Sequence, residues 1–199
     1  IESSTVTYPT GEPYTLVPIK IDISVIESLD PDKIYFIPIA IADATPYPIV
    51  KKKGNALLQI QKKNKYTSSA GPARYEGSGY FVITKTMVPL TKNRVRINIG
   101  TKRLPAEPEN QPDFIKKNTI VIEVADDNSL TVEPYDPEEM EVETVDVKVA
   151  HPGDNAYALY NNRLDPTTTT FCVCYKYRLK TGSWTEVREA IRLPVIVIE

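Results

Sequence analysis

Histidine, cysteine and glycine, on which many enzyme sites depend, are scarce in this sequence. Its 199 residues include one histidine, two cysteines and eight glycines. The single histidine, His151, lies in a turn-like stretch with Pro152 and Gly153, and we interpret it as an exposed loop residue. No Gly-x-Ser-x-Gly nucleophile elbow, phosphate-binding loop or dinucleotide-binding glycine pattern is present. These absences predict a chain that is not an enzyme and that carries no cofactor.

The two cysteines, Cys172 and Cys174, are poorly placed for a disulfide or a zinc site. Two residues apart on one face of a strand, their Cα atoms would be ~6.5–7 Å apart, at the upper limit for a disulfide. Zinc needs about four ligands, and only one histidine is available to join the two thiols. We therefore expect two small strand side chains and no metal site.

One acidic stretch is the remaining candidate for acid or cation chemistry. Residues 136–143 carry five carboxylates, with Pro134 and Pro137 beside them. Such a stretch between two strands keeps its carboxylates in water, which disfavours the buried acid of a glycosidase pair. Clustered carboxylates also suit calcium, so calcium coordination stays open as an alternative to a solvated loop.

The charge balance and the hydropathy exclude two classes of partner. Twenty-four basic residues against 26 acidic residues give a net charge of −2, without the basic surplus of a nucleic-acid binder. The short run Lys51–Lys53 precedes Gly54 and is interpreted as a solvated turn. No apolar run reaches the roughly 18 residues of a membrane span.

The chain begins at Ile1 without an initiator methionine or a signal segment, and we expect a mature or truncated product.

Seventeen prolines and many threonine, valine, isoleucine and tyrosine residues predict an all-β protein. Residues 14–24 alternate apolar and polar side chains, as a half-buried strand does. Residues 34–42 are almost entirely apolar and are predicted to be buried on both faces. Residues 55–62 supply a third strand. These elements predict a partial immunoglobulin-like β-sandwich module over residues 1–66, which we expect to be truncated.

The second module is predicted over residues 67–199, after a linker-like stretch of small and polar residues at 67–72. Turn signals at 126–128 and 180–183 join neighbouring strands as hairpins, which predicts an antiparallel meander or a barrel-like arrangement. Residues 187–193 also fit a short helix, and 195–198 fit a terminal strand. The eight predicted strands are 73–85, 94–100, 119–125, 129–135, 142–150, 156–161, 168–179 and 184–193.

Exposed aromatic rings beside amides and charges are the best candidates for ligand contact. An aromatic ring can cover the apolar face of a sugar while neighbouring polar groups bind its hydroxyls. The alternative for each ring is ordinary packing. The candidate ligand-binding residues are Tyr157, Tyr160, Asn162, Arg163, Trp184 and Tyr47.

Strand cores and turns in both modules carry a family resemblance. They are the N-terminal segments Tyr14–Ile21 and Leu29–Ile39, and the C-terminal segments Tyr75–Tyr80, Leu130–Tyr135 and Phe171–Tyr177 followed by Trp184, Val187 and Glu189. In these segments the chain resembles a family of Bacteroidetes surface lipoproteins encoded in polysaccharide-utilisation gene clusters. The resemblance covers nearly the whole chain and supplies no catalytic residue.

The resemblance implies export, anchoring at the outer membrane and a role in glycan handling. The first strands and the lipidated cysteine of the family are missing from this chain, so any membrane attachment runs through an anchor that the sequence does not contain. We therefore expect a non-catalytic cell-surface protein whose partner is a glycan. The alternative is a structural or adhesive module that meets another surface protein.

Overall fold

The chain is all-β, as predicted, and it divides into two units, Ile1–Lys62 and Lys63–Glu199. Within the described residues, no helix is both long enough and apolar enough to cross a membrane. The computed structural model describes residues 5–7, 11–12, 14–45, 48–50, 52–67, 73–77 and 82–193, and only the backbone of 73–77 and 82–84.

Unit 1 is built around one antiparallel strand pair. β1 (Tyr35–Ala40) pairs with β2 (Asn55–Ile60), with Tyr35 opposite Ile60 and Ala40 opposite Asn55. The short helix α1 (Ile23–Ser28) precedes them, and the Asp22 side chain caps it by accepting a hydrogen bond from the Ser24 amide at 2.8 Å.

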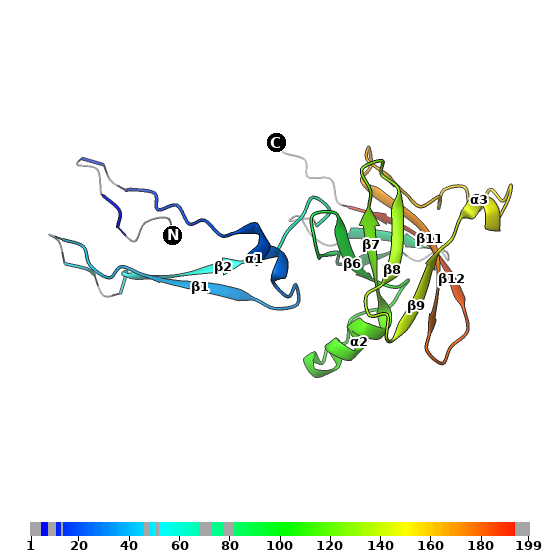
Figure 1. The fold of residues 1–199 in the computed structure, drawn as a ribbon, viewed down its shortest axis with the longest axis horizontal. Coiled ribbons are helices and arrows are strands. Elements are labelled where there is room, and N and C mark those ends of the chain that lie inside the picture. The colour runs from blue at the N-terminus through cyan, green and yellow to red at the C-terminus, as the bar shows by residue number, and fades with distance from the viewer. Residues whose placement is uncertain are drawn as a thin grey trace. The chain divides into compact units, whose positions relative to one another are not determined.

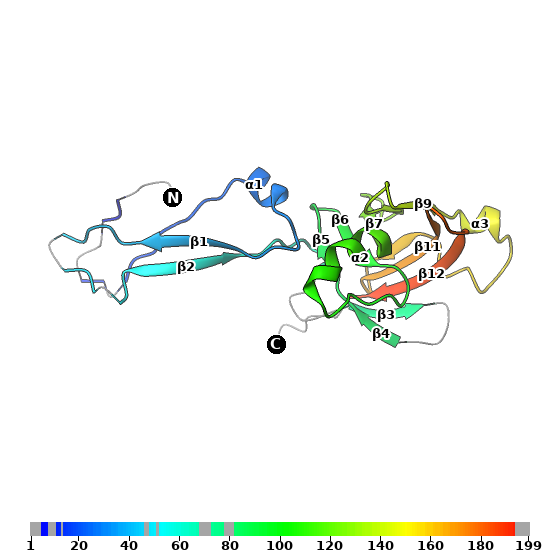
Figure 2. The same cartoon turned by 90° about the horizontal axis from the view of Figure 1, so that it is seen from below.

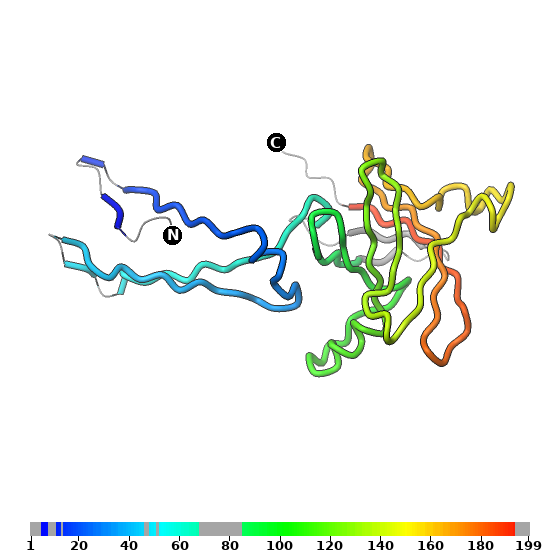
Figure 3. The backbone as a smooth tube through the Cα atoms, viewed as in Figure 1, coloured from blue at the N-terminus to red at the C-terminus, as the bar shows by residue number. Residues whose placement is uncertain are grey.

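Two predictions for unit 1 are wrong. Residues 14–22 form neither helix nor strand (blue in Figure 3), and the predicted strand over 14–24 ends inside α1, because the Asp22 cap favours a helical turn. Residues 34–42 are not buried on both faces, since burial alternates along β1 and Phe36 is 53% exposed. The described part of unit 1 thus holds one two-stranded sheet, where a sandwich would need two sheets.

Unit 2 holds two antiparallel sheets (Figure 1). The six-stranded sheet has the order β10-β11-β12-β3-β4, with β9 also pairing with β11, and Figure 2 shows β12 between β11 and β3. Its strands are β3 (Ala73–Gly77), β4 (Val82–Lys85), β9 (Met140–Thr144), β10 (Arg163–Asp165), β11 (Thr170–Leu179) and β12 (Thr185–Arg192). The four-stranded sheet consists of β5 (Val88–Pro89), β6 (Arg94–Asn98), β7 (Thr119–Val124) and β8 (Leu130–Pro134). The helical elements of unit 2 are η1 (Pro108–Asn110), α2 (Gln111–Asn118) and α3 (Val147–Ala150).

Most of the strands predicted for unit 2 are present. Those predicted at 94–100, 119–125, 129–135, 168–179 and 184–193 correspond to β6, β7, β8, β11 and β12, with ends shifted by a few residues. The predicted strand 73–85 is instead the antiparallel pair β3 and β4, and 142–150 ends in α3. Residues 156–161 form turns and bends in place of a strand. The strand expected at 195–198 lies outside the described residues.

One hydrophobic core joins the two sheets of unit 2. Ile97, Ile120 and Ile122 of the four-stranded sheet pack in the same cluster as Phe171 and Ile191 of the six-stranded sheet. Along β11, Phe171, Val173 and Tyr175 belong to this core, whereas Cys174 belongs to a small separate cluster. We call the face of the six-stranded sheet that carries Cys174 its outer face.

A buried ion pair lies on the inner side of β12. Glu189 is 0% exposed and Lys85 4%, and the Lys85 Nζ is 2.7 Å from a Glu189 carboxylate oxygen. The other carboxylate oxygen accepts hydrogen bonds of 2.6 Å from the Tyr175 hydroxyl and from the Gly100 amide. Lys85 also donates to the Asn98 carbonyl at 2.7 Å. Burial lowers the pKa of Lys85, and the Glu189 charge opposes that effect.

The start of unit 2 is fixed to its core by two neighbouring side chains. The Asn64 side chain donates to the carbonyls of Thr91 and Arg94, at 2.7 and 3.2 Å. Tyr66 is 3% exposed and packs edge-on against Phe171, with ring centroids 5.4 Å apart. The chain is therefore attached to the core of unit 2 within a few residues of leaving unit 1.

Replacing Lys85 tests the buried ion pair. Lys85→Met leaves the Glu189 carboxylate buried without its counter-ion, so we expect the free energy of unfolding to fall by about 3–5 kcal/mol. Urea denaturation followed by the fluorescence of Trp184, the only tryptophan, measures this change. The exposed Lys92→Met substitution is the control and should cost less than about 0.5 kcal/mol. A loss below about 1 kcal/mol for Lys85→Met would contradict a stabilising role for the pair.

Candidate functional site

The outer face of the six-stranded sheet gathers most of the polar and aromatic side chains of interest. Side chains on one face of a strand recur every second residue, so Glu186 and Arg188 of β12 lie on the face opposite Glu189. On β11, Lys176 is directly opposite Glu186 and Cys174 is opposite Arg188. Trp184 comes immediately before β12 at the same end of the sheet.

The first group on this face is the Trp184 platform, formed by Trp184, Lys176, Arg178, Glu141 and Glu143. The Lys176 Nζ and the Arg178 Cζ lie 4.9 and 4.8 Å from the centre of the Trp184 ring. Lys176 pairs with Glu143 at 2.8 Å, and Arg178 pairs with Glu141 at 2.7 Å. Both cations project from the same face of β11 as the indole, and Trp184 is 36% exposed.

The second group is the His151 cluster, formed by His151, Tyr157, Tyr160, Glu186 and Arg188. The rings of His151 and Tyr157 stack with centroids 3.7 Å apart and an angle of 12° between their planes. The His151 Nε2 lies 3.0 Å from a Glu186 carboxylate oxygen. The Arg188 guanidinium lies 4.2 Å from the Tyr157 ring centre and 5.7 Å from that of Tyr160.

The environment of the His151 cluster does not activate a nucleophile. Cys174 is 0% exposed, and burial raises its pKa to about 11, with the Glu186 charge acting in the same direction. A hydrogen bond to the Glu186 carboxylate, together with burial, raises the pKa of Tyr157. Both groups therefore stay protonated near neutral pH. His151 lies in a loop, as predicted, but its side chain is only 24% exposed, because the imidazole stacks on Tyr157 and contacts Glu186.

The segment that supplies this cluster leaves the sheet after β9 and returns at β10 (Figure 3). Asp146 precedes α3, and its carboxylate caps the helix by accepting from the amides of Lys148 and Val149. Near the return, the Asn162 amide donates to the Val145 carbonyl at 2.6 Å and accepts from the Cys174 amide at 2.7 Å. Asn162 thus closes the segment over Cys174.

The structure separates the six predicted site residues. Tyr157 and Tyr160 come together against Arg188, and Trp184 stands on its own platform. The polar atoms of Asn162 are used by backbone groups, and the Arg163 guanidinium donates to the Asp127 carbonyl at 2.6 Å, which supports a turn. Tyr47 lies outside the described residues.

Sequence reasoning missed His151, Glu186 and Arg188 as members of a site. The available signal was the period of two from Trp184 through Glu186 to Arg188, which places all three on one strand face. That signal is weak when 187–193 is also compatible with a helix. Lys176 and Arg178 could be assigned to a polar face, but their contacts with Trp184 depend on the hairpin that folds β12 onto β11.

The acidic stretch is only partly the solvated loop that was predicted. Glu141 and Glu143 lie on β9 and form the ion pairs of the Trp184 platform, while residues 136–139 form a turn before the strand. Among the described residues, no group of three or more histidine, cysteine, aspartate or glutamate side chains is arranged to hold a metal ion.

Comparison with known proteins finds one family model and several solved structures to which this chain is similar. A family model described as "-like, C-terminal" matches residues 54–192. No curated protein matches. Similar solved structures include three proteins from Bacteroides ovatus: two described as being of unknown function and one as a multidomain protein including DUF1735. Their sequence identities are 14%, 10% and 14%, and their TM-scores 0.35, 0.38 and 0.35, respectively.

These matches cover 79%, 84% and 79% of this chain, in the same order, and 55%, 58% and 54% of the matched chains. The present chain therefore spans somewhat more than half the length of each solved relative.

Removing the Asn162 side chain tests whether that residue closes the segment over Cys174. In a Cys172→Ala background, Asn162→Ala leaves the Val145 carbonyl and the Cys174 amide without their partner, which costs about 1–3 kcal/mol of local stability. We expect Cys174 to react on the order of tenfold faster with an aromatic disulfide reagent at about pH 8. Arg163→Ala is the control and should leave the rate unchanged. Equal rates for Asn162→Ala and its parent would show that another contact protects the thiol.

Proposed function

We propose that this chain, which belongs to the family described as "-like, C-terminal", is a non-catalytic protein that binds glycans at the bacterial cell surface. The binding site is the Trp184 platform on the outer face of the six-stranded sheet. Attachment to the outer membrane through a lipid anchor is part of this proposal and rests on the family resemblance.

The observation that carries the proposal is an exposed indole flanked by ordered charged side chains. Trp184 offers an aromatic surface, and Lys176 and Arg178 hold its orientation. Glu141 and Glu143 are each 56% exposed in their side chains and provide hydrogen-bond acceptors beside the ring. Ion pairs this exposed contribute only about 0–1 kcal/mol to stability, so the arrangement adds little to the fold. It does present the ring and the polar partners that sugar recognition requires.

The rings of the His151 cluster are less suited to stacking on a sugar. The Tyr157 ring is already covered by the His151 imidazole at 3.7 Å and by the Arg188 guanidinium at 4.2 Å. The neighbouring Cys174 thiol and the Tyr157 phenol have raised pKa values, which supports a non-catalytic role. Trp184 is therefore the principal ring of the proposed site.

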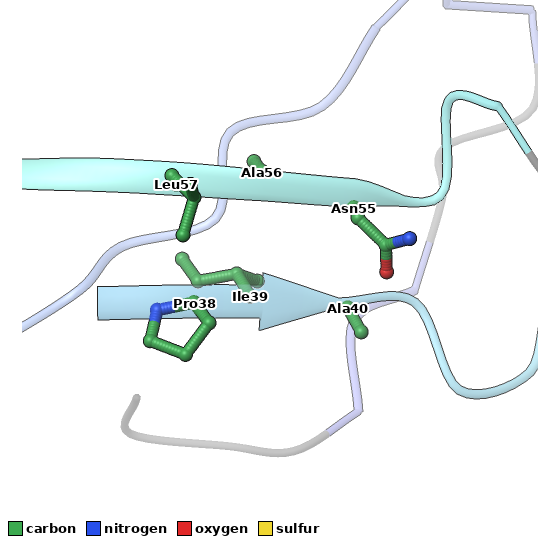
Figure 4. A pocket seen from close by; sticks show the side chains of 6 residues that line it. All are labelled: Pro38, Ile39, Ala40, Asn55, Ala56 and Leu57. Carbon is green, nitrogen blue, oxygen red and sulfur yellow. The ribbon is translucent and has the colours of Figure 1, made fainter. Parts of the chain in front are cut away.

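A second candidate function is adhesion to another protein through unit 1. Phe36 and Leu57 are 53% and 68% exposed on the two-stranded sheet, and Ile34 is 69% exposed just before β1. A shallow hollow crosses the same strands (Figure 4), and it is lined by Pro38, Ile39, Ala40, Asn55, Ala56 and Leu57. Exposed apolar surface of this kind is typical of protein contacts.

Substitution of Trp184 tests the proposed function. Trp184→Ala removes the stacking surface but leaves both ion pairs in place, so we expect at least about tenfold weaker binding to any polysaccharide that retains the wild-type protein. Affinity electrophoresis in gels that contain one soluble polysaccharide each gives the dissociation constants. Because Trp184 is exposed, thermal unfolding should change little.

Phe36→Ala is the matched control, since it removes an exposed aromatic ring from unit 1 and should not change retention. Wild-type retention that is unaffected by Trp184→Ala would contradict the platform as the site. If no polysaccharide retains the wild-type protein, the glycan proposal fails and the adhesive function is favoured.

A further inference from the structure

Arg188 is a cation of the outer face that forms no ion pair with any of the described side chains. Lys176 and Arg178 are each paired with a glutamate. Among the described side chains, no carboxylate lies within ion-pair distance of Arg188, although Glu186 is two residues away on the same face of β12. The Glu186 carboxylate is instead engaged by His151 and by the Tyr157 hydroxyl.

The guanidinium of Arg188 is nevertheless held in one place. It lies 4.2 Å from the Tyr157 ring centre and 5.7 Å from that of Tyr160, and its Nη1 donates to the Ala156 carbonyl at 3.0 Å. Stacking occupies the flat face of a guanidinium, whereas its five N–H donors point outward in the plane. One donor is used by Ala156, so several remain at the edge of a half-buried, orientated group.

We propose that Arg188 binds the carboxylate of an acidic sugar and forms the charged end of the glycan site. This inference rests on the proposed function of the Trp184 platform. A planar carboxylate matches two parallel N–H donors of a guanidinium, and fixing the arginine beforehand lowers the entropy lost on binding. The ligand class is therefore a polysaccharide that contains uronic acids.

The spacing along β12 supports a single extended ligand. Trp184 and Arg188 are four residues apart on the same strand face, which corresponds to about 13 Å. A glycan lying along the strand would place one sugar on the indole and a carboxylate, farther along the chain, at Arg188. Between them, Glu186 is already tied to His151, so it does not compete for Arg188.

Two polysaccharides with the same backbone test this inference: polygalacturonate and its methyl ester, in which the carboxylates are neutralised. We expect the wild-type protein to bind the acid at least about tenfold more tightly than the ester, and Arg188→Gln to abolish that preference. Arg188→Lys should recover only part of it, because an ammonium lacks the planar pair of donors.

Arg192→Gln is the matched control. Arg192 is an exposed arginine that lies four residues after Arg188 on the same face of β12 and carries the same charge. It should leave the preference intact. If Arg192→Gln weakens binding as much as Arg188→Gln, or if dextran sulfate competes as well as polygalacturonate, the effect is general attraction of anions and the inference is wrong.

Failure of this inference can be distinguished from failure of the proposed function. If acid and ester are bound equally, and both depend on Trp184, the platform stands and the assignment of Arg188 is overturned. If neither polysaccharide nor any neutral one is retained, the glycan function itself fails. Thermal unfolding of Arg188→Gln close to that of the wild type shows that lost binding does not arise from an unfolded cluster.

Discussion

The register of β12 is fixed by the buried Glu189 carboxylate, and the proposed site depends on that register. On the inner side of the sheet, Glu189 forms an ion pair with Lys85 and accepts hydrogen bonds from the Tyr175 hydroxyl and the Gly100 amide. Because side chains alternate along a strand, a slip of one residue would turn Glu189 toward water and bring Arg188 into the core. A buried ion pair is weak evidence of net stabilisation. Removing one partner, however, leaves an unpaired charge in the core and strongly destabilises the fold, so the pair disfavours alternative registers of β12. Glu186 and Arg188 are presented outward as a consequence.

The two aromatic groups on the outer face differ in how much of each ring is available. In the His151 cluster, the imidazole and the guanidinium lie over Tyr157, and the result is a rigid cover above the Cys174 thiol. In the Trp184 platform, two cations of β11 lie against the indole, and Trp184 is 36% exposed. The His151 cluster fixes the orientation of the Arg188 guanidinium, and the Trp184 platform exposes an aromatic surface. Their position on one strand joins both properties in the proposed site.

Local patterns in the sequence predicted the all-β class and most strands of unit 2, since period-two burial and hairpin turns are encoded within a few residues. The same pattern failed over residues 14–24, where the Asp22 cap starts a helix, and over 34–42, where an apolar run lies on an open sheet. The site could be predicted only in part. Trp184, Tyr157 and Tyr160 were identifiable as aromatic candidates, whereas the partners Arg188 and His151 depend on which strands and turns meet in space.

The attachment of Tyr66 and Asn64 to the core has a mechanical consequence for the chain. Asn64 donates to the Thr91 carbonyl and to the carbonyl of Arg94, the first residue of β6, and Tyr66 packs against Phe171 in the core. Tension applied through unit 1 would therefore reach the first core contacts of unit 2 almost at once, with little slack to take up the strain. The sheets of unit 2 would therefore bear such a load before the chain that leaves unit 1 could lengthen.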